Sequence, residues 1–231
     1  AGAVDHDEIV KLVEDRFGHL AKVRAHDTET ARFLGGETRV EKGLEQAHFA
    51  LAFETPGYRS PAVWTAQIFA TAFGGGMSSR LFQELREKRA LCYEIQSDLV
   101  SFEDGGLIQV YLALSPENLE EALQSISKVA RELINDGVEK AELEAAKSCL
   151  IGQSRISLEN TGSQMMWAGE CLLFFDEWKD PAAVHRQIEA VTEEEVHAEA
   201  MRLFSPFHFS SALIGPVESN YIIENWRQSV C

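Results

Sequence analysis

The chain has 231 residues, of which 45% are hydrophobic and 25% are charged, a composition typical of a globular domain with or without an appendage. It carries 37 acidic and 21 basic residues and a formal net charge of -16. Phosphate groups repel such a surface, so we expect neither nucleic acid nor a membrane as a partner, and no apolar run approaches the length of a membrane span.

The cysteines indicate a reducing compartment. None of them forms a C-x-x-C pair or has the spacing of a zinc finger or a disulfide scaffold. The first residues also lack the apolar centre of a signal peptide. We therefore expect reduced thiols and a cytoplasmic location for this chain. The four residues are Cys92, Cys149, Cys171 and Cys231.

The first predicted element is a helix that follows Asp5. Glu8 stands three residues after Asp5 as in a capping box, apolar residues recur at helical spacing, and Gly18 ends the pattern. From 21 to 46 the chain is polar and irregular, as is typical of a linker.

Short strands and helices follow the linker. Asp104, Gly105 and Gly106 separate two of the strands and have the chemistry of a hairpin turn. Because such a turn joins antiparallel neighbours, we predict an α+β fold, an antiparallel sheet with helices packed on one face. The predicted strands cover 47–53, 93–101, 107–114 and 207–214, and the predicted helices cover 61–73, 79–89, 116–134, 140–157, 161–175, 181–190, 192–204 and 219–228.

Two segments share one pattern at the two ends of the chain. Gly2-Ala3-Val4-Asp5 precedes Ile9, and Gly215-Pro216-Val217-Glu218 precedes Ile222 at the same offset. Either these are two ordinary turns into helices, or each segment closes one copy of a repeated domain. On the second interpretation, the chain begins with the last elements of an earlier copy.

No motif for a metal or for a nucleophile is present. Neither H-x-x-E-H nor H-E-x-x-H occurs, and no two of the seven histidines are three or four residues apart. Glu193 and His197 share a helical face, which a solvated helix surface explains. There is also no G-x-S-x-G motif. We therefore place no metal ligand in this chain.

Three consecutive glycines, Gly74, Gly75 and Gly76, lie between two predicted helices. A phosphate-binding loop follows a strand and ends in Lys-Ser or Lys-Thr, whereas this run follows a helix and continues as Met-Ser-Ser, which disfavours nucleotide binding. We expect a sharp turn that needs positive φ and acts as a hinge or a cleft-lining loop. Ser78 or Ser79 would cap the next helix.

Arg86 and Tyr93 are the candidate functional residues. They stand seven residues apart, nearly two helical turns, so both would face one way if the helix persisted. The guanidinium group can offer a planar fork of donors to carbonyl or carboxylate oxygens, and the phenol can donate to a carbonyl oxygen that gains charge. A solvated helix charge and an aromatic residue at a strand start would show the same residue types.

The stretch GGGMSSRLFQELREKRALCY, which ends at Tyr93, closely resembles the substrate-binding segment of a known family. The family is that of pitrilysin and mitochondrial processing peptidase, zinc metallopeptidases with an inverted zinc motif, and the segment belongs to their second half. Arg86, Arg89 and Tyr93 match the family pattern G-G-G-M-S-S-R-L-F-x-x-x-R-E-x-R-G-L-x-Y, whereas Ala90 replaces its usual glycine. The similarity extends to the segments 1–20, 104–114 and 138–147.

The resemblance implies a division of the chain and a role for it. Residues 1–35 would be the end of the first, zinc-bearing half plus a linker, and residues 36–231 the second, substrate-binding half. Zinc, its ligands and the general base would lie in the first half. The second half would close over a peptide substrate, with Arg86 binding its backbone and Tyr93 also acting as an oxyanion donor.

On the same resemblance, the intact protein contains zinc, while this chain alone binds no cofactor and is inactive. Its partners would be a peptide substrate and the first half or a family partner subunit, in a homo- or heterodimer. The alternative is a non-catalytic partner subunit or structural member of the same family.

Overall fold

The computed structural model describes residues 1–21, 29–204 and 209–217. These residues fall into two compact units. The larger unit consists of Ala31–Gly152 and Asp180–Cys231 as far as they are described, and the smaller unit consists of Ala1–Thr30 and Gln153–Lys179.

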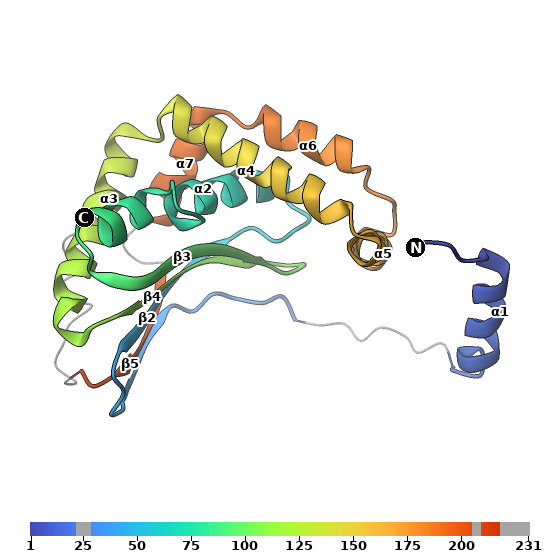
Figure 1. Cartoon of the computed structure of the whole chain (residues 1–231), viewed down its shortest axis with the longest axis horizontal. Helices are drawn as coiled ribbons and strands as arrows, with labels where there is room; N and C mark the ends of the chain where they lie inside the picture. Colours follow the sequence, from blue (N-terminus) through green and yellow to red (C-terminus); the bar gives the residue numbers. More distant parts are fainter. Residues whose placement is uncertain (22–28, 205–208, 218–231) are drawn as a thin grey trace. The chain divides into compact units, whose positions relative to one another are not determined.

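The larger unit is a five-stranded sheet of order β1-β5-β2-β4-β3, with α2, α3 and α7 on one of its faces (Figure 1). β2 pairs antiparallel with β4 and β5, and β3 pairs antiparallel with β4, which confirms the predicted α+β class. The strands are β1 Gly36–Glu41, β2 Ala47–Thr55, β3 Cys92–Ser101, β4 Gly106–Leu114 and β5 Phe209–Gly215. The helices are α2 Val63–Gly74, the π-helix η1 Phe82–Lys88, the 3-10 turn η2 Pro116–Asn118, α3 Leu119–Asp136, α4 Lys140–Leu158, α6 Pro181–Ala190 and α7 Glu193–Leu203, and the part of α4 from Gln153 onward is assigned to the smaller unit.

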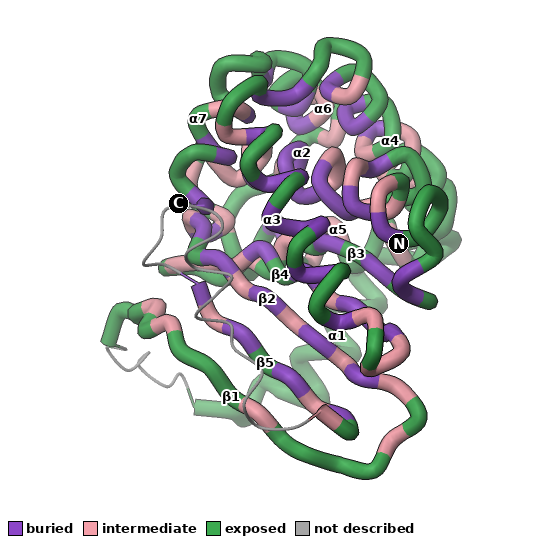
Figure 2. The backbone as a smooth tube through the Cα atoms, turned by 90° about the vertical axis from the view of Figure 1, so that its left-hand side faces the viewer, coloured by how far each residue is buried: buried purple, intermediate pink, exposed green. Residues whose placement is uncertain are grey.

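Alternating burial along the strands places the core between the sheet and the helices. In β2, Ala47, Phe49, Leu51 and Phe53 are buried, and the residues between them are more exposed (Figure 2). This period of two is what a strand with one covered face requires. The same pattern made β2 predictable from the sequence.

Phe204 joins the helices to the sheet. It follows α7, and its ring lies at centroid distances of 5.4 Å from Phe53 of β2, and 5.9 Å and 5.5 Å from Phe69 and Phe73 of α2. Its contacts are edge-to-face, the arrangement that aromatic rings prefer. One side chain therefore ties three elements together.

β1 corrects the predicted linker. Residues 36–41 form a strand inside the segment 21–46, and they pair parallel with β5 at the edge of the sheet. Most of these residues are exposed, so no apolar alternation marks them in the sequence. Their strand is defined by backbone pairing with a segment far along the chain. The predicted helix over 219–228 and the end of the second repeated segment lie outside the described residues.

The smaller unit contains α1 His6–Phe17, α5 Thr161–Glu170 and the π-helix η3 Cys171–Phe175. The Asp5 carboxylate accepts a hydrogen bond from the Glu8 N–H at 3.0 Å, which confirms the predicted cap of the first helix. The predicted helix 161–175 is divided into α5 and η3. Neither α1 nor α5 contains a buried residue.

Replacement of Phe204 by Ala should destabilise the larger unit by about 3–5 kcal/mol, because it removes a buried ring shared by three elements. Phe102→Ala is the matched control, since the Phe102 ring is exposed, and it should change stability by less than about 0.5 kcal/mol. Urea unfolding of both variants measures the difference. Equal losses would show that the Phe204 contacts do not hold the layers together.

Candidate functional site

The glycine run forms a close backbone crossing at the end of α2. Gly75 has a φ of -82°, and Gly74, Gly75 and Gly76 are absent from the described residues with positive φ, so that part of the prediction is wrong. A Cβ on Gly74 would lie 2.7 Å from the Cβ of Ser97, and one on Gly75 would lie 2.6 Å from the Cα of Thr71. Glycine is needed at these two positions for space.

Ser79 closes the turn that follows. Its buried hydroxyl donates to the carbonyl of Gly76 at 2.6 Å, whereas the sequence predicts a cap for the next helix. The Gln83 N–H donates to the backbone carbonyl of Ser79 at 3.0 Å, which continues the chain into a helical turn. The glycine run and the helix after it are therefore held as one piece.

A forked ion pair fixes the start of that helix. Arg80 Nε and Nη2 donate to the two carboxylate oxygens of Glu142 at 2.7 Å and 2.6 Å, and Nη2 also donates to the Gly137 carbonyl at 2.9 Å. Burial opposes ionisation of Glu142, but hydrogen bonds from Arg80 and from the Glu139 N–H outweigh it and lower its pKa. The hydrogen bond with Glu142 raises the pKa of Arg80. This arginine of the motif is structural.

Glu84 anchors the next turn to α3. Its carboxylate accepts from Arg89 at 3.1 Å and from Lys128 at 3.2 Å, and Arg89 also reaches Glu121 at 3.0 Å. Burial opposes ionisation of Glu84, but these hydrogen bonds prevail and lower its pKa. Arg89 matches the family pattern, and its position between two carboxylates gives it a structural reason to be there.

Arg86 differs from the other two arginines of the motif. Its side chain is exposed, and no carboxylate among the described residues pairs with it. Its guanidinium carbon lies 4.8 Å from the ring centroid of Phe82, one helical turn earlier. An aromatic face attracts the guanidinium and leaves the edge donors of the fork accessible. Arg86 is therefore supported by the protein while its hydrogen bonds remain available to a ligand.

Arg86 lies on a π-helix, whereas the sequence predicts an ordinary α-helix. Phe82–Lys88 form this segment, and the helix ends before β3 begins at Cys92. Seven residues therefore do not amount here to two turns of one helix, and Tyr93 lies on a strand. π-Helical turns are rare in proteins overall. Those that occur are often found at functional sites, because they displace side chains from the helical repeat.

Tyr93 is the extra residue of a β-bulge. Cys92 opposes Leu114 and Glu94 opposes Ala113, so the register shifts between Cys92 and Glu94 and Tyr93 has no opposite residue. A bulge redirects side chains and interrupts their alternation. Tyr93 is accordingly 75% exposed. Sequence reasoning missed this bulge, although two exposed residues between buried Cys92 and Ile95 break the strand period and could have indicated it.

Electrostatics relate Arg86 to this strand start. Burial raises the pKa of the Cys92 thiol to about 11, and the positive charge of Arg86 opposes that rise. The charge of Arg86 therefore acts on the residue that immediately precedes Tyr93. The two side chains offer hydrogen-bond donors to carbonyl or carboxylate oxygens. In the described ranges of the chain, no group of three or more His, Cys, Asp or Glu residues is placed to hold a metal ion.

Ala90 occupies a strained position between η1 and β3. Its φ is 51°, in the left-handed region that favours glycine. The next N–H, that of Leu91, donates to the Leu85 carbonyl at 2.8 Å, which fixes the chain reversal. The usual glycine of the family pattern suits this conformation better than alanine does.

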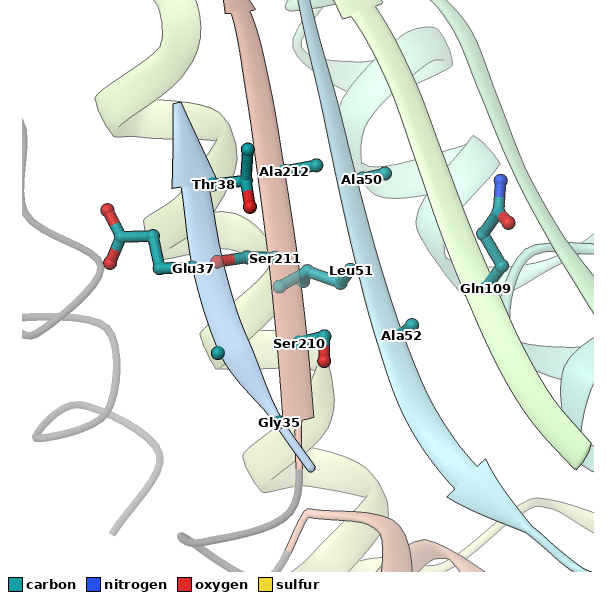
Figure 3. Close-up of a pocket in the computed structure, with 11 residues that line it drawn as sticks. Gly35, Glu37, Thr38, Ala50, Leu51, Ala52, Gln109, Ser210, Ser211 and Ala212 are labelled. Carbon is teal, nitrogen blue, oxygen red and sulfur yellow. The ribbon is translucent and has the colours of Figure 1, made fainter. Parts of the chain in front are cut away.

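The sheet face opposite the helices carries a shallow depression of about 410 Å³ (Figure 3). Small side chains from β1, β2 and β5 line most of it, with Gln109 of β4 at one side and Glu37 at the other. The sequence did not lead us to predict this depression, although the alternating alanines of β2 could have indicated a strand face with small side chains. The small side chains are those of Thr38, Ala50, Ala52, Ser210 and Ala212.

Gly74→Ala should destabilise the chain by about 1–3 kcal/mol, because its methyl group would overlap Ser97. Gly76→Ala is the matched control. No atom lies within 4 Å of a Cβ at that position, so this variant should be neutral or up to about 1 kcal/mol more stable. Thermal unfolding of the two variants tests the crossing, and an equal effect of both would contradict it.

Ala90→Gly should leave stability unchanged or raise it by up to about 1 kcal/mol, since relief of the positive φ offsets the entropy that glycine adds to the unfolded chain. Ala145→Gly in the exposed middle of α4 is the control and should cost about 1 kcal/mol. Urea titration of both variants gives the difference. A loss at Ala90 as large as at Ala145 would refute strain at Ala90.

Comparisons with known proteins agree with this fold and motif. Residues 1–150 match the family described as peptidase M16 inactive domain. An uncharacterized zinc protease of Mycobacterium leprae is 37% identical over 226 residues, which are 95% of this chain and 50% of that protein. The zinc protease YmxG of Bacillus subtilis, also uncharacterized, is 32% identical over 211 residues, 91% of this chain and 51% of its own length. The chain thus spans about half the length of these relatives.

Solved structures show the same fold at low sequence identity. A chain of complex III2 from Candida albicans has a TM-score of 0.85 and 18% identity, and the match covers 98% of this chain and 56% of that one. The peptidase M16 inactive domain from Pseudomonas fluorescens has a TM-score of 0.69 and 22% identity, over 81% of this chain and 45% of its own. In the described part of the chain, none of the helices is long and apolar enough to cross a membrane. With its family match over residues 1–150, its half-length zinc protease relatives and its fold, the chain belongs to the family of peptidase M16 inactive domains.

Proposed function

We propose that this chain is the substrate-binding C-terminal half of a zinc metalloendopeptidase. Residues 1–35 are then the end of the first half plus a linker, and residues 36–231 are the second half. The observation that carries the proposal is the contrast within the motif. Arg80 and Arg89 are held by carboxylates, whereas Arg86 is without one among the described residues and Tyr93 is exposed on a bulge.

The residues of this chain contribute donors rather than a metal site. Among the described residues, no group of three or more His, Cys, Asp or Glu side chains is placed to hold a metal ion, and the proposal assigns the zinc to the first half. There the metal would activate water and polarise the scissile carbonyl. Arg86 would bind carbonyl or carboxylate oxygens of the peptide through its fork, and Phe82 would hold the guanidinium in place.

Tyr93 would act on the carbonyl oxygen that becomes negatively charged during attack. Tyr93 is 75% exposed, so its phenol would be accessible to a peptide enclosed between the two halves. A single donor of this kind is worth about 100- to 1,000-fold in turnover. Because the donor lies on a separate half, it is placed only when the halves close over the substrate. The partners are then the peptide and the first half, or a family partner subunit in a homo- or heterodimer.

The alternative is a non-catalytic partner subunit or structural member of the family. The match to a chain of complex III2 shows that this fold occurs within a large assembly. Retention of Arg86 and Tyr93 in accessible positions favours catalytic service to a zinc site, because a purely structural subunit has no need of them there.

Tyr93→Phe in the full-length protein should lower the kcat for peptide cleavage by about 100-fold with little change in KM, because the lost donor acts in the transition state. Arg86→Gln should chiefly raise KM. Tyr58→Phe, a half-buried tyrosine outside the motif, is the control and should leave both constants unchanged. Steady-state kinetics on a peptide substrate decides the matter.

Two results would contradict the proposal. Unchanged kcat in Tyr93→Phe would remove Tyr93 from catalysis. A zinc-supplied full-length protein that cleaves no peptide would support the non-catalytic alternative.

A further inference from the structure

Exposed apolar side chains are concentrated in the smaller unit. Among the described residues, seven large exposed hydrophobic side chains lie in residues 1–21 and seven in residues 153–179, whereas the larger unit has seven in all. The smaller unit contains only about a quarter of the chain. Scattered exposed hydrophobic residues are normal, but concentration in one small unit marks an interaction surface.

One group of these exposed apolar side chains lies on α5, on η3 and on the few residues that follow η3. Met165 and Met166 come from α5, Leu172 and Leu173 from η3, and Trp178 follows two residues after its C-cap. All five are exposed, and Leu173 is 81% exposed. We call these five residues the α5–η3 surface. In η3 the one buried residue is Cys171, so this segment has almost no core of its own.

The other part is the apolar stripe of α1, made of Ile9, Val13 and Phe17 with their neighbours Val10 and Leu12. An amphipathic helix gains most of its stability by burying its apolar face. α1 is exposed along its whole length (Figure 2). A Cβ on Gly2 would lie 3.2 Å from the Thr161 side chain, so the chain just before α1 contacts the start of α5.

We propose that the α5–η3 surface is buried against the first half of the same polypeptide, to whose end the proposed division already assigns α1 and its apolar stripe. This inference rests on the pairing of halves in the proposed function and adds the surface that mediates it. The relatives are about twice as long as this chain, which leaves room for a first half of similar size to cover the surface.

Charge distinguishes the first half from a second copy of this chain. Glu170, Asp176 and Glu177 are exposed at the border of the α5–η3 surface. Lys179 is the one basic residue of the sequence 170–180, and it pairs with Glu177. Two identical acidic borders would repel each other across a self-association interface, so a partner of different sequence fits better.

Three of the four methionines provide the test. Met165 and Met166 of the α5–η3 surface are 53% and 56% exposed, and Met201 of α7 in the larger unit is 50% exposed. Hydrogen peroxide transfers one oxygen to an accessible thioether and leaves water, and mass spectrometry follows each sulfoxide. The full-length protein is oxidised at several concentrations, with guanidinium-denatured protein as the reference for each methionine.

For each methionine, the oxidation rate in the native full-length protein is divided by its rate in the denatured protein. This ratio should be at least about 10-fold lower for Met165 and Met166 than for Met201, at every protein concentration. Leu173→Asp should accelerate oxidation of Met165 and Met166 without changing Met201. If this variant unfolds, which faster oxidation of Met201 reveals, the milder Leu173→Gln replaces it and should give the same selective acceleration.

Equal rates at the three methionines would overturn the proposal. Protection that disappears on dilution would also overturn it, since it would assign the surface to a second copy. Oxidation by peroxide requires no catalysis by the protein, so a kinetic test that fails to support Arg86 and Tyr93 would leave the oxidation result valid. Conversely, rapid oxidation of Met165 and Met166 in an active enzyme would refute only the docking surface.

Discussion

The candidate site depends on two groups of ion pairs that fix an unusual helical turn. The fork between Arg80 and Glu142 holds the residues just before the turn against the beginning of α4, and the carboxylate of Glu84 holds the first part of the turn against α3 through Lys128. A π-helix of seven residues has poor intrinsic stability and persists when its surroundings determine it. These partly buried, hydrogen-bonded ion pairs hold the π-helix in its conformation.

The segment that follows accumulates departures from regular structure. The π-turn, the positive φ of Ala90 and the bulge at Tyr93 lie within twelve residues. Each has a cost, and such features cluster where a particular side-chain direction is required. Together they bring the chain from a helix to a strand while Arg86 and Tyr93 remain outside the core. The glycine crossing at Gly74 lets the preceding helix approach the strand closely enough for this short connection.

Sequence patterns predicted the elements whose burial is periodic and whose ends carry local signals. The period of two in β2 and the cap at Asp5 both appear in the structure. β1 could not be predicted in this way, because its residues are exposed and its pairing partner, β5, is distant in sequence. The same limitation applies to the site. Its residue types were readable, but the π-turn, the bulge and the ion pairs that distinguish Arg86 from Arg80 arise from tertiary packing.

The bulge at Tyr93 has a consequence for how the site tolerates changes in chain length. A bulge is a difference of one residue between two paired strands. The orientation of Tyr93 therefore depends on the number of residues in β3 as well as on its own chemistry. Deletion of a single residue between Cys92 and Ile95 would let the strands pair without interruption, and the sheet beyond Ile95 would keep its register. The aromatic side chain would then be lost or moved to another face while the fold survived. Descendants of such a protein could therefore lose the site in one step, by deletion, without passing through an unstable intermediate.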